Sequence, residues 1–137
     1  ADLGAGSGTT AAAVFEANPN AQIWTIDISQ DNLHWAGAIV ESMGKTERWV
    51  ALNMDSVAAA EFLGDAMWDL VLIDTSHEYE HTKAELTAWL PRLNPGGLVW
   101  LHDYIGYDGV KRACDEFAEI GKLTAIEQSG LGILVRP

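Results

Sequence analysis

A glycine-rich turn within residues 1–10 is the feature that most constrains how this chain can fold. An acidic residue, Asp2, is followed by glycines at alternate positions, Gly4, Gly6 and Gly8, and then by a run rich in alanine. Glycine reaches backbone conformations closed to other residues and lets a ligand approach the main chain closely. The pattern predicts a strand that turns tightly into a helix whose free N–H groups face a ligand.

The spacing of these glycines separates two classes of nucleotide ligand. A dinucleotide-binding turn has glycine at the first, third and sixth positions of its motif. Counted from Gly4, the fifth position is Gly8 and the sixth is Thr9. The spacing therefore disfavours a nicotinamide or flavin dinucleotide. A glycine motif alone can also be no more than a turn.

Composition narrows the class of protein. With 137 residues, 48% of them hydrophobic, the chain is sized for one domain with a single core. A net charge of −12 argues against nucleic acid and anionic membranes as partners. We find no apolar run of membrane-spanning length and no signal-peptide pattern, and a single cysteine, Cys114, so we expect a cytoplasmic protein without an internal disulfide.

The strand that leads into the glycine turn is unusually short. The sequence begins without methionine and almost inside the motif, so only residues 1–3 could belong to that strand. In an α/β domain this strand is central, and its loss would leave the neighbouring strands without partners. We therefore expect residues 1–137 to form a single domain that lacks N-terminal residues, with its first strand truncated.

Strands and helices alternate along the chain, which predicts a doubly wound α/β fold with a mostly parallel sheet. The expected strands are 21–27, 48–52, 68–74 and 98–101, and the expected helices are 9–17, 30–43, 56–62, 78–93 and 108–120. The helix 78–93 is expected to end at Asn94-Pro95-Gly96-Gly97. The tail, 123–128 and 131–136 around Ser129-Gly130, predicts an antiparallel hairpin.

With this ending, the opening motif resembles motif I of the class I S-adenosylmethionine (SAM) methyltransferases, an acid followed by G-x-G-x-G. That family carries a seventh, antiparallel strand hairpinned onto a Rossmann-like sheet, so the resemblance covers nearly the whole chain. In the family the glycine backbone lies close to the methionine part of SAM. The residues that the resemblance assigns to this side of the pocket are Asp2, Gly4, Ala5, Gly6 and Ser7.

Asp27 is the next candidate for cofactor binding. It ends the second expected strand, where a carboxylate can accept both hydroxyl hydrogens of a ribose. The family places its ribose-binding acid there, and the resemblance adds Ile28 beside it. The competing role for Asp27 is capping of the next helix, although Ser29 can already act as the cap.

The stretch after the third expected strand resembles the adenine-binding segment of the family. By that resemblance Asp55 lies near the exocyclic amine, Met54 lies against the ring, and Ser56 completes the segment. The alternative is ordinary turn chemistry, with Ser56 capping the helix 56–62.

Residues 77–81 match the H-E-x-x-H zinc motif, which places two histidines on one helix face. Five residues at this degeneracy often match by chance. Thr75 and Glu78 also predict a capping box, which makes the segment the exposed first turn of a helix. We therefore disfavour a zinc site and expect His81 to be a solvated helix residue.

A second set of polar residues follows the strands 68–74 and 98–101. An Asp-x-x-His-x-Tyr pattern begins at Asp74, and His102-Asp103 follows the later strand. The set resembles the metal-dependent sugar O-methyltransferases of macrolide and related antibiotic biosynthesis, and the cephalosporin-hydroxylase and rhamnosyl-methyltransferase-like proteins. By that resemblance Asp74 and Asp103 hold a divalent metal, Mg²⁺ by preference, His77 is the general base, and Asp74 also borders the cofactor.

The metal assignment leaves alternatives open. Two carboxylates suit a hard ion, which lowers the pKa of substrate hydroxyls. His102 stands where the sugar enzymes have an acid, and a histidine ligand would admit Mn²⁺, Fe²⁺ or Zn²⁺. Asp74 and Asp103 could instead cap turns, with His77 or His102 acting alone as base.

These features together predict a SAM-dependent methyltransferase that acts on a hydroxyl of a small molecule, such as a sugar or glycosylated metabolite. The alternatives are a metal-free methyltransferase with a histidine base and a SAM-binding domain without transferase activity. Neither the acceptor nor the oligomeric state follows from the sequence.

Overall fold

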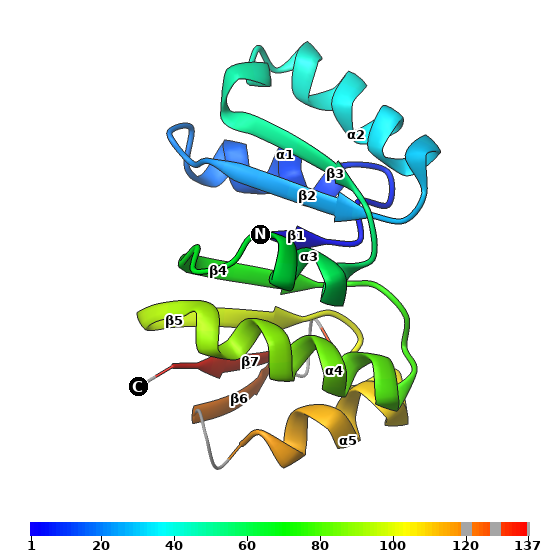
Figure 1. Ribbon diagram of the computed structural model, residues 1–137, viewed down its shortest axis with the longest axis vertical. Coiled ribbons are helices and arrows are strands. Elements are labelled where there is room, and N and C mark those ends of the chain that lie inside the picture. Colours follow the sequence, from blue (N-terminus) through cyan, green and yellow to red (C-terminus); the bar gives the residue numbers. More distant parts are fainter. Residues whose placement is uncertain (119–121, 127–129, 137) are drawn as a thin grey trace. The chain divides into compact units, whose positions relative to one another are not determined.

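The computed structural model describes residues 1–118, 122–126 and 130–136, and the chain divides into two compact units, Ala1–Ala59 and Ala60–Pro137. Strands and helices alternate as predicted (Figure 1). The elements are β1 (Asp2–Leu3), α1 (Thr9–Ala17), β2 (Ile23–Asp27), α2 (Gln30–Ser42), η1 (Thr46–Arg48), β3 (Trp49–Asn53), α3 (Ser56–Phe62), β4 (Trp68–Ile73), α4 (Tyr79–Trp89), η2 (Leu90–Arg92), β5 (Leu93–Leu101), α5 (Asp108–Glu116), β6 (Lys122–Ile126) and β7 (Leu131–Val135). No helix in the described ranges has the length and apolarity needed to cross a membrane.

The first unit is built on three parallel strands in the order β3-β2-β1. Apolar side chains of α1 and α2 pack on this sheet, and the buried cluster they form comprises Ala11, Phe15, Ile23 and Val40. The Ser29 hydroxyl accepts the N–H of Asn32 and caps α2, as predicted. The helix ends just before Gly44, whose φ of 67° suits glycine at a helix end.

The second unit carries the strands β4-β5-β7-β6. β4 and β5 are parallel, whereas β7 runs antiparallel to both β5 and β6, which confirms the predicted C-terminal hairpin. The predicted residues 127–129 of the hairpin and 119–120 of the preceding helix lie outside the described residues. Trp89 of α4 packs edge-to-face on Trp68 of β4, with ring centroids 5.8 Å apart, and this contact holds α4 on the sheet.

The Asn94-Pro95-Gly96-Gly97 stretch does not follow the prediction. It is part of β5, and α4 ends at Trp89 with a 3-10 turn after it. The difference arises because the glycines meet the end of β7. The Gly96 N–H donates to the carbonyl of Arg136 (3.0 Å), and the Arg136 N–H donates to that of Gly97 (2.9 Å). Strand pairing thus extends through a segment whose composition predicts a turn.

Candidate functional site

The glycine turn joins β1 to α1 in left-handed backbone conformations. The φ angles of Gly4, Gly6 and Gly8 are 95°, 49° and 84°. A Cβ at Gly8 would lie 2.6 Å from the Cα of Ala36, so this glycine lets α1 approach α2 closely. A Cβ at Gly6 would meet nothing within 4 Å, and no described residue accepts the backbone N–H of Gly6 or Ser7. The turn therefore has open space and free donors, which fits an anionic or polar ligand group.

Asp2 is buried beside this turn, with 1% of its surface exposed. Its carboxylate accepts the hydroxyl hydrogen of Thr25 (3.3 Å), and the Thr25 oxygen accepts the indole N–H of Trp49 (2.8 Å). An indole N–H can only donate, so the single hydroxyl hydrogen of Thr25 is left for Asp2. A directed chain of hydrogen bonds thus runs across β3, β2 and β1 to the acid of the motif.

Asp27 links the glycine turn to α2. Its carboxylate accepts the backbone N–H groups of Ala5 (2.8 Å) and Ser29 (2.7 Å) and the side-chain amide of Asn32 (3.1 Å). These contacts use most of the acceptor positions of a carboxylate, so a ribose would share or displace them. Asp27 therefore takes part in capping α2, which the sequence offered as the alternative to ribose binding. Ile28, beside it, is 76% exposed and free to meet a ligand.

Asp55, rather than Ser56, caps α3. Oδ1 of Asp55 accepts the N–H groups of Val57 (3.0 Å) and Ala58 (2.9 Å), whereas Ser56 is the first residue of the helix and is buried. One oxygen of Asp55 thus accepts two N–H groups of the first turn, which corrects the prediction for Ser56. The Met54 N–H donates to the carbonyl of Asp27 (3.1 Å), which keeps this segment beside β2.

Three predicted metal ligands meet where β4 and β5 end. Asp74 follows β4, and His102 and Asp103 follow β5. Nδ1 of His102 lies 3.0 Å from Oδ2 of Asp103 and 3.6 Å from Oδ1 of Asp74, and one ligand atom of each residue falls within 4.8 Å of the others. Asp103 has a φ of 58°, a left-handed conformation rare for a residue with a side chain. Two carboxylates and an imidazole form a donor set that fits a divalent cation.

His77 adjoins this cluster. Its Nε2 lies 2.8 Å from Oδ2 of Asp103, and its ring stacks on that of Tyr107 with centroids 3.9 Å apart. A Cβ at Gly109 would lie 2.4 Å from the carbonyl oxygen of His77, so the start of α5 approaches the turn closely only because position 109 is glycine. The His77 ring is thus held by Asp103 and Tyr107, and its backbone is held by the close approach of Gly109.

The zinc motif at 77–81 does not form a zinc site. Helix α4 begins at Tyr79, so His77 precedes it and shares no helix face with His81. His81 lies on α4 with 32% of its side chain exposed, and its Nε2 lies 3.2 Å from Oε1 of Glu85, a partner that the prediction did not include. This geometry removes the basis of the H-E-x-x-H reading.

The predicted capping box of Thr75 and Glu78 is also absent. Glu78 is the N-cap residue without a side-chain bond, and the Thr75 hydroxyl instead donates to Glu85 (2.8 and 2.9 Å). Glu85 and Tyr107, the stacking partner of His77, were not among the residues predicted from the sequence. The signal for Glu85 is its helical spacing from Thr82 and Trp89, which places it on the buried stripe of α4.

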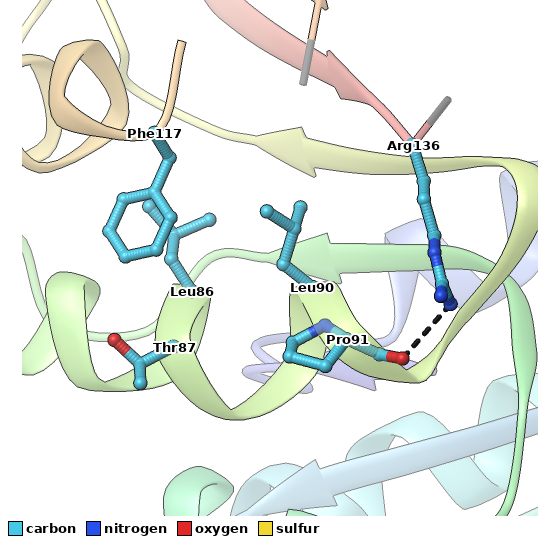
Figure 2. Close-up of a pocket in the computed structure, with 6 residues that line it drawn as sticks. All are labelled: Leu86, Thr87, Leu90, Pro91, Phe117 and Arg136. Atoms are coloured by element: carbon cyan, nitrogen blue, oxygen red, sulfur yellow. Dashed lines mark hydrogen bonds between the residues drawn. The ribbon is translucent and has the colours of Figure 1, made fainter. Parts of the chain in front are cut away.

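An apolar pocket lies in the second unit. Figure 2 shows Leu86 and Leu90 of α4 and η2, Phe117 after α5 and Arg136 after β7 around it. The Arg136 guanidinium donates to the carbonyl of Pro91 (2.9 Å). The pocket offers few polar groups to a cofactor, and none of the candidate residues lines it.

Several known proteins that are similar to this chain are methyltransferases. Residues 1–104 match the model of a family described as a methyltransferase domain. A stretch of 47 residues is 47% identical to the release factor glutamine methyltransferase of Gloeobacter violaceus. It covers 34% of this chain, which spans only 16% of that relative's length.

Solved structures extend the likeness over the full fold. A candidate caffeoyl-CoA O-methyltransferase from Staphylococcus aureus has a TM-score of 0.82 at 13% identity, over 99% of this chain and 74% of that one. A TDP-rhamnose 3′-O-methyltransferase of calicheamicin biosynthesis has a TM-score of 0.74 at 19% identity, over 98% and 69%. A Podospora anserina methyltransferase solved with S-adenosylhomocysteine (SAH) has a TM-score of 0.80 at 16% identity, over 98% and 69%.

The fold is therefore that of the class I methyltransferases. More narrowly, the chain belongs to the SAM-dependent methyltransferase family whose domain model matches residues 1–104.

Proposed function

We propose that this protein transfers the methyl group of SAM to a hydroxyl of a small molecule with the help of a divalent metal ion. The observation that carries the proposal is the convergence of Asp74, His102 and Asp103, with His77 bound to Asp103, at the ends of two neighbouring parallel strands. This edge is where α/β folds bind ligands. The names of two similar structures, both O-methyltransferases, support oxygen as the accepting atom.

The first unit supplies the proposed cofactor residues. The glycine turn, with free N–H groups at Gly6 and Ser7, suits the methionine part of SAM, and Asp2 adds a carboxylate on that side. Asp27 and Ile28 would meet the ribose, and Met54, Asp55 and Ser56 would border the adenine. Oδ1 of Asp55 is already used as a cap, so adenine recognition there would fall to its other oxygen.

Asp74, His102 and Asp103 would hold the metal, which supplies positive charge that acidifies a hydroxyl of the acceptor. The two carboxylates favour Mg²⁺, and the histidine broadens the choice to Mn²⁺, Fe²⁺ or Zn²⁺. Their side chains are 31% to 52% exposed, so the cluster is open to a ligand from solvent.

His77 would take the proton of the acceptor hydroxyl. Its Nε2 faces a carboxylate oxygen, so in the neutral ring Nε2 carries the hydrogen and Nδ1 the lone pair. The acceptor oxygen bonds to the methyl carbon as the carbon–sulfur bond breaks, the sulfur keeps the electron pair in SAH, and the proton passes to Nδ1. Orientation of the three atoms in line would provide most of the catalysis.

The same geometry supports a second mechanism. A histidine oriented by a carboxylate is the arrangement of a general base, and it needs no metal. The two mechanisms differ in their response to chelation, because only the metal-assisted one depends on an ion at Asp74, His102 and Asp103.

Calorimetric titration of the protein with SAM, followed by an acceptor screen with methyl-labelled SAM, tests the function. We expect SAM to bind, a hydroxylated acceptor to be labelled, EDTA to stop turnover and Mg²⁺ to restore it. Full turnover in EDTA would select the metal-free mechanism. SAM binding without labelling of any acceptor would indicate a binding domain, and absence of SAM binding would overturn the proposal.

A further inference from the structure

Glu85 is a buried acid that the proposed mechanism does not use. It lies in the middle of α4 with 0% of its surface exposed, on the stripe that also buries Leu86 and Trp89. A carboxylate removed from water is tolerated only where hydrogen bonds or opposite charge compensate for the lost hydration. Its partners therefore show what this residue holds in place.

One partner of Glu85, Thr75, lies on the turn between β4 and α4, and another, His81, lies on α4 itself. The Thr75 hydroxyl lies 2.8 Å from Oε1 and 2.9 Å from Oε2, and Nε2 of His81 lies 3.2 Å from Oε1. One turn earlier on the helix, the Thr82 hydroxyl donates to the carbonyl of Ser76 (3.4 Å). Two consecutive residues of the turn, Thr75 and Ser76, are thus tied to α4.

This turn presents two proposed functional groups. Asp74 immediately precedes Thr75, and His77 immediately follows Ser76. Asp74 and His77 must both meet residues after β5, yet the segment 74–78 between β4 and α4 belongs to no helix or strand. Backbone without regular hydrogen bonding keeps one conformation only if side chains hold it. The bonds from α4 supply that restraint.

We propose that Glu85 is a positioning residue that acts through Thr75 to fix the turn 74–77, so that Asp74 is preorganised toward His102 and His77 toward Asp103. The inference rests on the proposed function of these residues and adds the element that places them. Partners behind metal ligands commonly matter in this way, and their loss typically lowers metal affinity about 10-fold to 100-fold.

The test replaces the hydroxyl of Thr75 in the whole chain. Thr75→Val removes the bond at nearly constant shape, Thr75→Ser keeps it, and Thr87→Val makes the same change at an exposed position of α4. Binding of Mn²⁺ is followed by electron paramagnetic resonance. We expect about 10-fold to 100-fold weaker binding for Thr75→Val, and affinity near that of the parent for the other two variants.

A metal-free readout separates this inference from the proposed function. Nitrogen-15 NMR of the imidazoles reports the hydrogen bond of His77 to Asp103. We expect the resonances of His77 to indicate a weaker hydrogen bond in Thr75→Val and an unchanged one in Thr75→Ser. If the parent protein binds no Mn²⁺, the metal-assisted function fails and the His77 resonances alone decide the role of Glu85.

Glu85→Met, which removes both acceptor oxygens, provides a second route, with circular dichroism reporting whether it folds. If it folds, we expect it to weaken the hydrogen bond of His77 as Thr75→Val does, and if it does not, the Thr75 variants carry the test. Unchanged Mn²⁺ binding and unchanged His77 resonances in Thr75→Val would overturn the inference. Equal losses in Thr75→Ser and Thr75→Val would also overturn it, because the hydroxyl would then be irrelevant.

Discussion

Nε2 of His77 lies 2.8 Å from Oδ2 of Asp103, although 26 residues separate them in the chain. The same oxygen lies 3.0 Å from Nδ1 of His102. One carboxylate oxygen therefore serves both a proposed base and a proposed metal ligand. Replacement of this single side chain should affect both functions at once.

Asp103→Asn tests this shared role. The amide keeps the shape of the side chain, and asparagine tolerates the left-handed backbone at this position, so we expect a thermal midpoint near that of the parent. Because the charge is lost, metal affinity should fall at least about 10-fold, and methyl transfer should fall with it. Asp65→Asn, at an exposed position in the same unit, is the control. Metal affinity that survives in Asp103→Asn would contradict this role.

Thr25→Val should weaken recognition of the methionine part of SAM. The change breaks the hydrogen-bond chain from Trp49 that orients the Asp2 carboxylate, and we expect up to about a tenfold loss in affinity for SAM, which corresponds to about 1.4 kcal/mol. Calorimetry should show the loss for SAM and SAH but not for methylthioadenosine, which lacks the amino acid group. Thr25→Ser should restore affinity. Equal weakening for all three ligands would indicate a general loss of sheet structure instead.

Cys114 should not react in the folded protein. Burial, followed by the nearby Asp115 carboxylate, raises the pKa of this thiol to about 12, and the side chain is fully buried on α5. Thiolate is the reactive form of cysteine. A chromogenic disulfide reagent at pH 8 should therefore show almost no reaction with Cys114 until the chain is unfolded. One equivalent should then react, because the sequence has a single cysteine. Rapid reaction under native conditions would contradict the burial of α5.

Glu116 should stabilise the packing of α5 on α4 in a pH-dependent way. Its carboxylate lies 2.7 Å from the Lys83 ammonium and accepts the Tyr79 hydroxyl, and these two bonds lower its pKa. A lowered folded-state pKa means that the stabilisation is present above the ordinary value of 4.5 and is lost as pH falls through the folded value.

The thermal midpoint of Glu116→Gln should therefore lie below that of the parent at pH 7, and this difference in midpoint should disappear at acidic pH. Because the side chains of Lys83 and Glu116 are exposed, the difference should be small and should decrease further in high salt. Glu80→Gln, at an exposed position of α4 for which no ion pair is found among the described residues, is the control. An equal difference at both pH values would exclude the ion pair as its cause.

Features that depend on neighbouring residues were predictable from the sequence. The Ser29 cap, the alternation of strands and helices, and the C-terminal hairpin all follow from short patterns, and the structure confirms them. The closeness of Asp74 and Asp103 was implied by the resemblance to the metal-dependent sugar O-methyltransferases, which assigns both residues to one metal ion.

The errors arise where a distant partner competes with a local one. Thr75 lies within reach of a capping box with Glu78, but a buried carboxylate ten residues away takes its hydroxyl. Gly96 and Gly97 have the composition of a turn, yet pairing with Arg136 from the end of the chain makes them a strand. Such contacts join residues that are distant in the sequence, so they can be identified only from the three-dimensional structure.

The backbone at Asp103 limits which residues can stand there. Glycine, asparagine and aspartate adopt its left-handed conformation most readily, and aspartate alone among them brings a charge. A change to glycine would relieve strain while deleting a proposed ligand, and the glycine turn and Asp27 lie in the other unit. A descendant could therefore lose the proposed methyl transfer in one mutation while keeping its fold and the proposed SAM-binding residues, so the proposed catalysis is easier to lose than the fold.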